Sequence, residues 1–192
     1  DDRGSGEDRM MEADVVITNG TLLTMDAQMS VLEGGFIGVT GDRISHIGVE
    51  NPVPIRAKKV IDARGGFVLP GLINGHTHAS MTLFRGLADD LPLMEWLTEY
   101  IFPAESRMDK DFVRTGAMLA CAEMILSGAT TFCDMYLFED EVAEAAQETG
   151  MRCVVGEVLY DFPSPNYGRI EKGFEYTEFL IRKWSGNPLV SI

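Results

Sequence analysis

Two histidines stand one residue apart at the end of an apolar stretch. His76 and His78 close the segment Pro-Gly-Leu-Ile-Asn-Gly-His-Thr-His of residues 70–78, which follows the apolar run of residues 67–69. Alternate side chains of a strand point to the same side, so a buried strand that ended here would direct both imidazoles to one point. Neutral imidazole is the commonest metal ligand in proteins. The spacing therefore predicts a metal site at His76 and His78, although the same pair in a polar turn would bind nothing.

The order of apolar patterns along the chain predicts an α/β protein. Residues 13–63 contain short strand-like runs separated by turn signals, which favours a small β-sandwich or sheet. From residue 67 onward, strand-like runs alternate with helical ones, as in βα units with a parallel sheet. The runs that begin near residues 67, 130, 153 and 188 would be the first four strands of a (β/α)8 TIM-type barrel. Because such a barrel needs eight strands and about 250 residues, we expect the chain to be part of a longer protein.

These patterns divide the chain into three expected segments. Residues 1–11 have the composition of a disordered tail, residues 12–65 would form the N-terminal part of a small β-sandwich domain, and residues 66–192 would form the first part of the barrel, truncated in its fourth strand. Asn-Gly supplies positive φ, so a hairpin is expected at Asn19-Gly20, and a second turn at Gly41-Asp42. Helices are expected at residues 91–101, 112–126, 139–149 and 175–184.

Composition and charge limit the classes of function. The chain has 192 residues, of which 45% are hydrophobic, and a net charge of -14. It has enough apolar residues for a core, and its charge argues against binding to nucleic acid or to an anionic membrane surface. No membrane-spanning run or signal-peptide pattern is expected. Cys121, Cys133 and Cys153 lie among apolar neighbours, as free thiols in a reducing compartment would, so we predict a cytoplasmic protein.

The segment of residues 70–78 resembles the first-strand metal motif of the amidohydrolase superfamily. The resemblance continues through residues 81–97 and resumes at Gly-Ala-Thr-Thr-Phe-Cys-Asp-Met-Tyr, residues 128–136. This combination of segments is similar to the branch of the superfamily that holds the methylthioadenosine/S-adenosylhomocysteine deaminases, the guanine deaminases and the triazine chlorohydrolases. The resemblance covers roughly residues 12–192 and is strongest to the first of these groups.

This resemblance implies a metal-dependent hydrolytic deaminase in which His76 and His78 hold one divalent ion, zinc or alternatively iron. The remaining family ligands are a histidine on each of the fifth and sixth strands and an aspartate on the eighth. These ligands and the proton-handling glutamate would lie beyond Ile192, so no catalytic acid or base is expected within this chain. The implied partner is a small purine nucleoside such as methylthioadenosine, S-adenosylhomocysteine or adenosine. Relatives of this type commonly assemble, which implies a homo-oligomer.

Three further residues match substrate-binding positions of the family. Trp96 matches a tryptophan that lines the substrate pocket, although its apolar helical stripe equally suits core packing. Glu105 matches the glutamate that binds the ribose hydroxyls in adenosine-type deaminases, and a carboxylate can accept from both hydroxyls of a cis-diol. Arg169 matches an arginine that reaches the substrate tail, such as the carboxylate of homocysteine. Glu157 replaces a second such arginine of some relatives, which favours methylthioadenosine or adenosine over S-adenosylhomocysteine.

Other interpretations stay open at this point. A guanine or triazine substrate has no ribose and would not need Glu105. A relative that had lost its metal would be non-catalytic, although the intact His76 and His78 argue against this. His46, the third histidine, is expected to be a half-exposed strand residue rather than a ligand, and Asp134 is expected to play a structural capping role.

Overall fold

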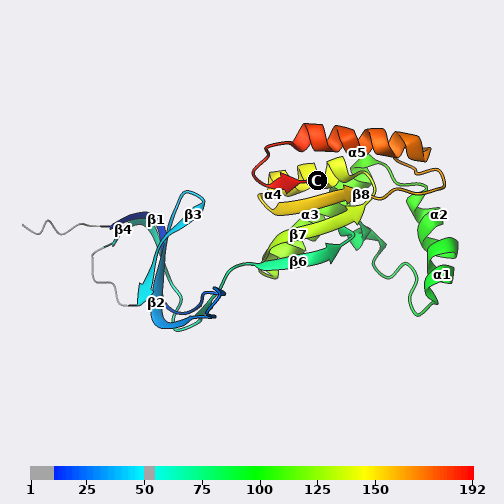
Figure 1. Cartoon of the computed structure of the whole chain (residues 1–192). Coiled ribbons are helices and arrows are strands. Elements are labelled where there is room, and N and C mark those ends of the chain that lie inside the picture. Colours follow the sequence, from blue (N-terminus) through cyan, green and yellow to red (C-terminus); the bar gives the residue numbers. More distant parts are fainter. Residues whose placement is uncertain (1–10, 50–54) are drawn as a thin grey trace, which may run out of the picture. The chain divides into compact units, whose positions relative to one another are not determined.

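The computed structural model describes residues 11–49 and 55–192 (Figure 1). The chain divides into two compact units, of which the first ends at Pro70 and the second begins at Gly71. The predicted tail at residues 1–11 lies outside the described residues except for its last residue. No helix in the described ranges combines the length and the apolar character that crossing a membrane requires.

The described strands of the first unit form one sheet. They are β1 (Met11–Leu23), β2 (Val31–Thr40), β3 (Arg43–Val49), β4 (Ile55–Asp62) and β5 (Phe67–Val68). The order is β3-β2-β1-β4, and β5 also pairs with β1. The pairs β1–β2 and β2–β3 are antiparallel, whereas β4 and β5 run parallel to β1. Because these strands make a single sheet, the predicted β-sandwich is not confirmed.

Asn19-Gly20 does not form the predicted hairpin. Strand β1 runs through both residues, and its register with β2 shifts between Ile17 and Leu22. Asn19 adopts the left-handed conformation with a φ of 55°, as Asn tolerates better than most residues. The Asn-Gly pair therefore serves as a bulge within a strand rather than as a turn, and the hairpin prediction was wrong. The predicted turn at Gly41-Asp42 does connect β2 to β3.

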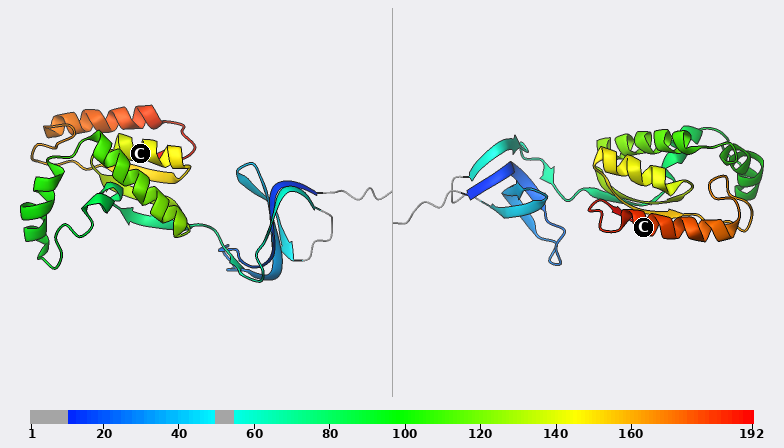
Figure 2. Two further views of the ribbon diagram at one scale, coloured as in Figure 1. Left: turned by 180° about the vertical axis from the view of Figure 1, so that it is seen from behind. Right: turned by 90° about the horizontal axis from the view of Figure 1, so that it is seen from above.

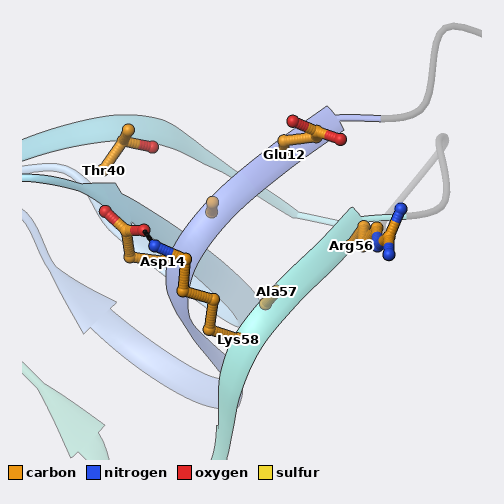
Figure 3. A pocket seen from close by; sticks show the side chains of 7 residues that line it. Glu12, Asp14, Thr40, Arg56, Ala57 and Lys58 are labelled. Carbon is orange, nitrogen blue, oxygen red and sulfur yellow. Dashed lines mark ion pairs between the residues drawn. The ribbon is translucent and has the colours of Figure 1, made fainter.

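Asp14 links β1 to β4 and to the turn between β2 and β3 (Figure 3). Its Oδ1 lies 2.7 Å from Nζ of Lys58 on β4, and its Oδ2 accepts a hydrogen bond of 2.7 Å from the backbone N–H of Gly41. The Gly41 N–H and then Lys58 lower the pKa of Asp14. A hollow of about 540 Å³ lies beside these residues. Since the charges of Asp14 and Lys58 satisfy each other, we assign them a structural role.

The second unit is built on a four-stranded parallel sheet. Its strands β6 (Leu72–Thr77), β7 (Ala129–Tyr136), β8 (Arg152–Glu157) and β9 (Val190–Ser191) pair in that order. The segments between them are η1 (Ala79–Phe84), α1 (Leu93–Glu95), η2 (Trp96–Ile101), α2 (Phe102–Glu105), α3 (Lys110–Leu126), α4 (Glu139–Thr149) and α5 (Ile170–Trp184). The predicted βα alternation is confirmed, and the described residues contain four parallel strands rather than a closed barrel.

Burial alternates along the central strands of this sheet. On β7, Phe132, Asp134 and Tyr136 are buried, whereas Cys133 and Met135 between them are exposed. The buried side chains belong to a core that helices α3, α4 and α5 complete as they pack against the sheet (Figures 1 and 2). The helices predicted from residues 112, 139 and 175 correspond to α3, α4 and α5, of which α3 begins earlier, at Lys110, and α5 begins earlier, at Ile170.

The strand predicted from residue 67 to the histidines is divided in two. Phe67 and Val68 form β5 in the first unit, and β6 starts at Leu72 in the second. Pro70 between them lacks the N–H that an interior strand residue donates. Phe67 is 72% exposed, and Leu72 is exposed as well. A strand does lead to His76, as predicted, but the expectation of one buried strand was wrong.

The helix predicted at residues 91–101 changes register inside its length. Its α1, η2 and α2 segments follow one another from Leu93 to Glu105, and η2 is a π-helix. A π turn contains more residues than an α turn, so it shifts the side chains that follow it. Ile101 is therefore 2% exposed and Tyr100 is 41% exposed. The regular 3.6-residue stripe had placed both on the same face.

Gly116 allows α3 to approach η1, the segment that directly follows His78. A Cβ atom at Gly116 would lie 2.5 Å from the carbonyl oxygen of Ser80 and 2.9 Å from its Cα. Because these are backbone atoms, we predict that Gly116→Ala lowers the free energy of unfolding by about 1–3 kcal/mol. Urea denaturation followed by circular dichroism would measure this loss. Gly156→Ala is the control, since nothing lies within 4 Å of a Cβ there, and equal losses in both variants would contradict the prediction.

Candidate active site

Strand β6 carries the two histidines to the C-terminal end of the parallel sheet. The centroids of the His76 and His78 rings lie 5.2 Å apart, edge to face. Nδ1 of His78 lies 2.6 Å from the carbonyl oxygen of Met135 at the end of β7. This contact requires Nδ1 to donate, which leaves Nε2 free to accept a proton or to bind a metal ion. Metal-binding histidines commonly anchor their second nitrogen in this way, so the local geometry suits the predicted role of His78.

The donor chemistry of this pair fits a zinc ion in part. Two imidazole nitrogens are half of a tetrahedral donor set. Within the described ranges, no group of three or more His, Cys, Asp and Glu side chains could hold a metal ion. A zinc ion would therefore need further ligands in addition to His76 and His78.

A pocket of about 290 Å³ opens beside His78. Its walls are mostly apolar and aromatic, and they come from the helical stretch of residues 93–105 and from the ends of β7 and β8. The principal wall residues are Trp96, Leu97, Ile101, Phe102, Tyr136 and Tyr160. The register shift in η2 contributes to this wall, because Trp96 and Ile101 are five residues apart and both face the pocket.

Glu105 is the one carboxylate of the pocket lining, and it is 5% exposed. Burial raises the pKa of Glu105, while a hydrogen bond with Tyr136, the charge of His78 and a hydrogen bond with Tyr160 act in the opposite direction. A buried carboxylate in an apolar wall favours ligands that bring hydrogen-bond donors to it. The structure thus places Glu105 and Trp96 in one pocket with His78.

Arg169 does not reach this pocket. It precedes α5 as an exposed residue, and its Nε lies 3.4 Å from the Glu171 carboxylate. The pocket lining does not include it. Its predicted contact with a substrate tail therefore gains no support from its placement.

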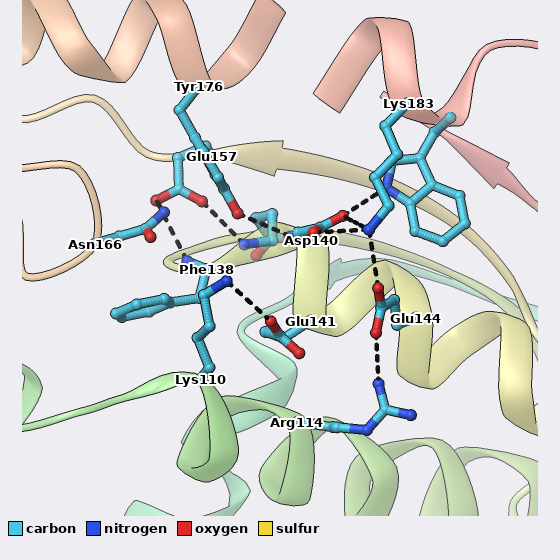
Figure 4. A network of polar contacts seen from close by, with 12 residues as sticks. Lys110, Arg114, Phe138, Asp140, Glu141, Glu144, Glu157, Asn166, Tyr176 and Lys183 are labelled. Atoms are coloured by element: carbon cyan, nitrogen blue, oxygen red, sulfur yellow. Dashed lines mark hydrogen bonds and ion pairs between the residues drawn. The ribbon is translucent and has the colours of Figure 1, made fainter. Parts of the chain in front are cut away.

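Glu157 also faces away from the pocket. Its carboxylate accepts hydrogen bonds from the backbone N–H groups of Phe138 and Glu139, at 3.3 and 2.9 Å, and from Nδ2 of Asn166 at 2.8 Å (Figure 4). It therefore caps the N-terminus of α4. Burial raises the pKa of Glu157 to about 7, against the effect of these hydrogen bonds. The charge at this position serves the fold and is not presented to a ligand in the pocket.

The sequence pattern of the amidohydrolase family matches residues 67–185, well over half of the chain. The chain belongs to the amidohydrolase family. It is 57% identical over 182 residues to a 5-methylthioadenosine/S-adenosylhomocysteine deaminase of Syntrophobacter fumaroxidans. The match covers 94% of this chain and 42% of that relative, so this amidohydrolase chain spans less than half of the relative's length.

Two solved structures share the fold of this chain. The chain superposes with a TM-score of 0.90 and 33% identity on a zinc-bound adenosine deaminase of Xanthomonas campestris, over 95% of this chain and 42% of that one. An atrazine chlorohydrolase of Arthrobacter aurescens, complexed with zinc, matches with a TM-score of 0.79 and 22% identity, over 93% of this chain and 45% of that one. At this lower identity, the second match shows the fold alone.

Sequence reasoning missed most of the pocket lining of this amidohydrolase, of which Met135 and Tyr160 are two examples. Met135 acts through its carbonyl oxygen, which no side-chain motif reveals. Tyr160 follows β8 and lines the pocket from a loop. The position of both at the ends of parallel strands was the available signal, because active sites of this fold lie at those ends.

The raised pKa of Glu157 predicts a pH-dependent stability. The folded protein holds this proton more tightly than the unfolded chain, whose pKa would be near the ordinary 4.5. The contribution of Glu157 to the free energy of unfolding is therefore fully present below about pH 4.5. It is lost as pH rises through about 7, which lowers the free energy of unfolding by up to about 3 kcal/mol. We expect Glu157→Gln to make this decline shallower in urea-denaturation midpoints measured between about pH 5 and pH 8. A decline as steep as in the parent would contradict the assignment.

Proposed function

We propose that the protein carrying this chain is a metal-dependent hydrolase that removes the amino group from the adenine ring of a nucleoside. Methylthioadenosine, S-adenosylhomocysteine and adenosine are the candidate substrates. The observation that carries the proposal is Glu105, a buried carboxylate in an aromatic pocket that reaches His78. The names of the similar proteins from Syntrophobacter fumaroxidans and Xanthomonas campestris support the same class of reaction.

The residues of the site have distinct parts in this reaction. A zinc ion (or alternatively iron) held by His76, His78 and ligands from elsewhere in the protein would lower the pKa of a bound water and so supply hydroxide near neutral pH. The hydrogen bond to the Met135 carbonyl holds the His78 ring in one orientation and one tautomer. The aromatic wall would exclude water from the purine, and Glu105 would accept hydrogen bonds from the ribose diol.

The pocket favours a nucleoside with an uncharged 5′ substituent. Glu105 and His78 are its ionisable groups besides two tyrosines, and the rest of the lining is apolar. Arg169 pairs with Glu171 on the surface and is not available to a homocysteine carboxylate in this arrangement. We therefore place methylthioadenosine or adenosine ahead of S-adenosylhomocysteine.

Guanine and triazine rings are the alternative substrates, and a non-catalytic relative is the alternative to an enzyme. A ring without ribose would leave Glu105 buried with no diol to bind. The presence or loss of the later metal ligands in the full-length protein decides between the enzyme and the non-catalytic relative.

Metal content tests the two histidines directly. We predict that His76→Ala and His78→Ala each reduce the zinc retained by the full-length product of the gene after dialysis against a weak chelator, as measured by elemental analysis. His46→Ala is the matched control, because His46 lies on β3 in the first unit beside Ser45. Zinc retention by His76→Ala at the level of the His46→Ala control would contradict the assignment.

Turnover of paired substrates tests Glu105. We predict that Glu105→Ala lowers kcat/KM for methylthioadenosine by about 10-fold or more, because a hydrogen bond to a charged group contributes about 1.5–3 kcal/mol. The loss should be much smaller for 2′,3′-dideoxyadenosine, which lacks the diol. Loss of the adenine ultraviolet band reports both reactions, and Glu99→Ala, an exposed glutamate of the same helical stretch, is the control. Equal losses for the two substrates would contradict diol binding, and no turnover of any nucleoside by the metal-loaded protein would contradict the proposed function.

A further inference from the structure

A pair of buried carboxyl groups lies behind the two histidines, and the proposed reaction does not use it. Asp134 on β7 is 1% exposed, and Glu139 at the first position of α4 is 0% exposed. The two side chains are within hydrogen-bonding reach of each other. Asp134 Oδ2 and both oxygens of Glu139 nevertheless have no donor among the described residues.

The fourth carboxyl oxygen of the pair, Oδ1 of Asp134, contacts the turn that carries the two histidines. Oδ1 of Asp134 lies 2.8 Å from the hydroxyl of Thr77, which also approaches the Cys133 carbonyl oxygen at 2.9 Å. The same Oδ1 accepts a hydrogen bond of 2.9 Å from the backbone N–H of Ala79. Thr77 stands between the two histidines and Ala79 follows the second. Asp134 therefore contacts the residues on both sides of His78, through the side chain of Thr77 and the backbone of Ala79.

Cations close to the start of α4 are occupied by other acids (Figure 4). The ion pairs are Lys110–Glu141 at 3.6 Å, Arg114–Glu144 at 2.9 Å and Lys183–Asp140 at 2.8 Å. Among the described residues, none of the ion pairs includes Asp134 or Glu139. The charge of this carboxyl pair is thus not balanced by a lysine or an arginine within that part of the chain.

The N-terminus of α4 does not supply the missing donor either. Its free N–H groups at Phe138 and Glu139 donate to Glu157 on β8. Burial raises the pKa of Glu139, and the neighbouring charges of Asp134 and Glu157 raise it further. His78, Tyr136 and the thiols of Cys121 on α3 and Cys153 on β8 also lie near the pair, and burial raises the pKa of Tyr136 and of each thiol. A buried carboxyl group in these surroundings is stabilised as the neutral acid, which has an O–H to donate.

We propose that Glu139 is a neutral acid that donates a hydrogen bond to Oδ2 of Asp134, so that the two residues form a clamp that positions the His76-Thr77-His78 turn. One proton between the two carboxyl groups supplies the donor that the Asp134 oxygen lacks. Glu139 is then a positioning residue, acting on the histidines through Asp134. The expected effect on zinc binding rests on the proposed metal site, but the test does not require substrate turnover.

Two substitutions at Glu139 separate hydrogen-bond donation from packing. The amide of Glu139→Gln can still donate to Asp134, so we expect the zinc affinity of the full-length protein to stay within about 2-fold of the parent. Glu139→Leu fills the space with an apolar side chain but leaves Asp134 Oδ2 without a donor. It should weaken zinc binding by about 10–100-fold, as loss of an outer partner of a metal ligand typically does. Glu141→Leu, in the same turn but paired with Lys110, is the control and should bind zinc like the parent. An equal loss of affinity in Glu139→Gln and Glu139→Leu would overturn the proposal.

Infrared spectroscopy tests the proton itself, without metal or substrate. With 13C-labelled glutamate, the parent should show the isotope-shifted carbonyl band of a protonated carboxylic acid near neutral pH. This band should lose intensity in Glu139→Gln, where Glu157 and Glu105, whose pKa values are also raised by burial, account for what remains, and it should keep its intensity in Glu141→Leu. Absence of the band from the parent, or an unchanged intensity in Glu139→Gln, would overturn the neutral-acid assignment. Normal zinc binding by His76→Ala would instead count against the proposed function and leave the infrared result unaffected.

Discussion

The parallel register of β6 against β7 determines where the side chains of the site can lie. Thr77 on β6 pairs with Asp134 on β7, so the neighbours of Thr77 lie beside the neighbours of Asp134. His78 consequently reaches the Met135 carbonyl from one face of the sheet, while the Thr77 hydroxyl reaches Asp134 on the face that the helices cover. One strand pairing therefore fixes both the open side of the site, with its imidazoles, and the buried side, with its carboxyl groups.

The buried side carries an electrostatic cost. Asp134, Glu139 and Glu157 lie near one another in the layer between sheet and helices, and burial raises the pKa of all three. Glu157 offsets part of this cost by capping α4, and Asp134 offsets part by holding the histidine turn. Phe138, just before α4, adopts a left-handed conformation with a φ of 57°, which is unfavourable for a bulky residue. Strain and buried charge thus coincide directly behind the histidines, as is common near functional sites.

The sequence revealed those parts of the structure that depend on regular patterns. The alternation of strands and helices after residue 67 and the extent of α4 were predicted in this way, whereas the expectation that Trp96 and Glu105 line a pocket came from the family resemblance. The failures have local physical causes. Asn19-Gly20 provided the conformational freedom of a turn, but strand pairing with β2 used it for a bulge. The stripe around Tyr100 assumed a constant helical period, and the π turn broke that period. The role of Glu157 depends on a backbone N-terminus that meets it only after folding, and no residue pattern records such a contact.

The π turn at η2 has a consequence for how this pocket could diverge among proteins. In an α-helix, each residue turns the chain by about 100°, so deletion of a single residue from this segment would rotate the flanking halves against each other by about that angle. Trp96 at the start of η2 and Glu105 at the end of α2 would stand on opposite sides of such a deletion and would no longer face the same space. A change in chain length, with every pocket residue retained, would then be sufficient to redirect the ligand preference of the site. A sequence comparison that counts only identical residues would find the same pocket residues in such a protein.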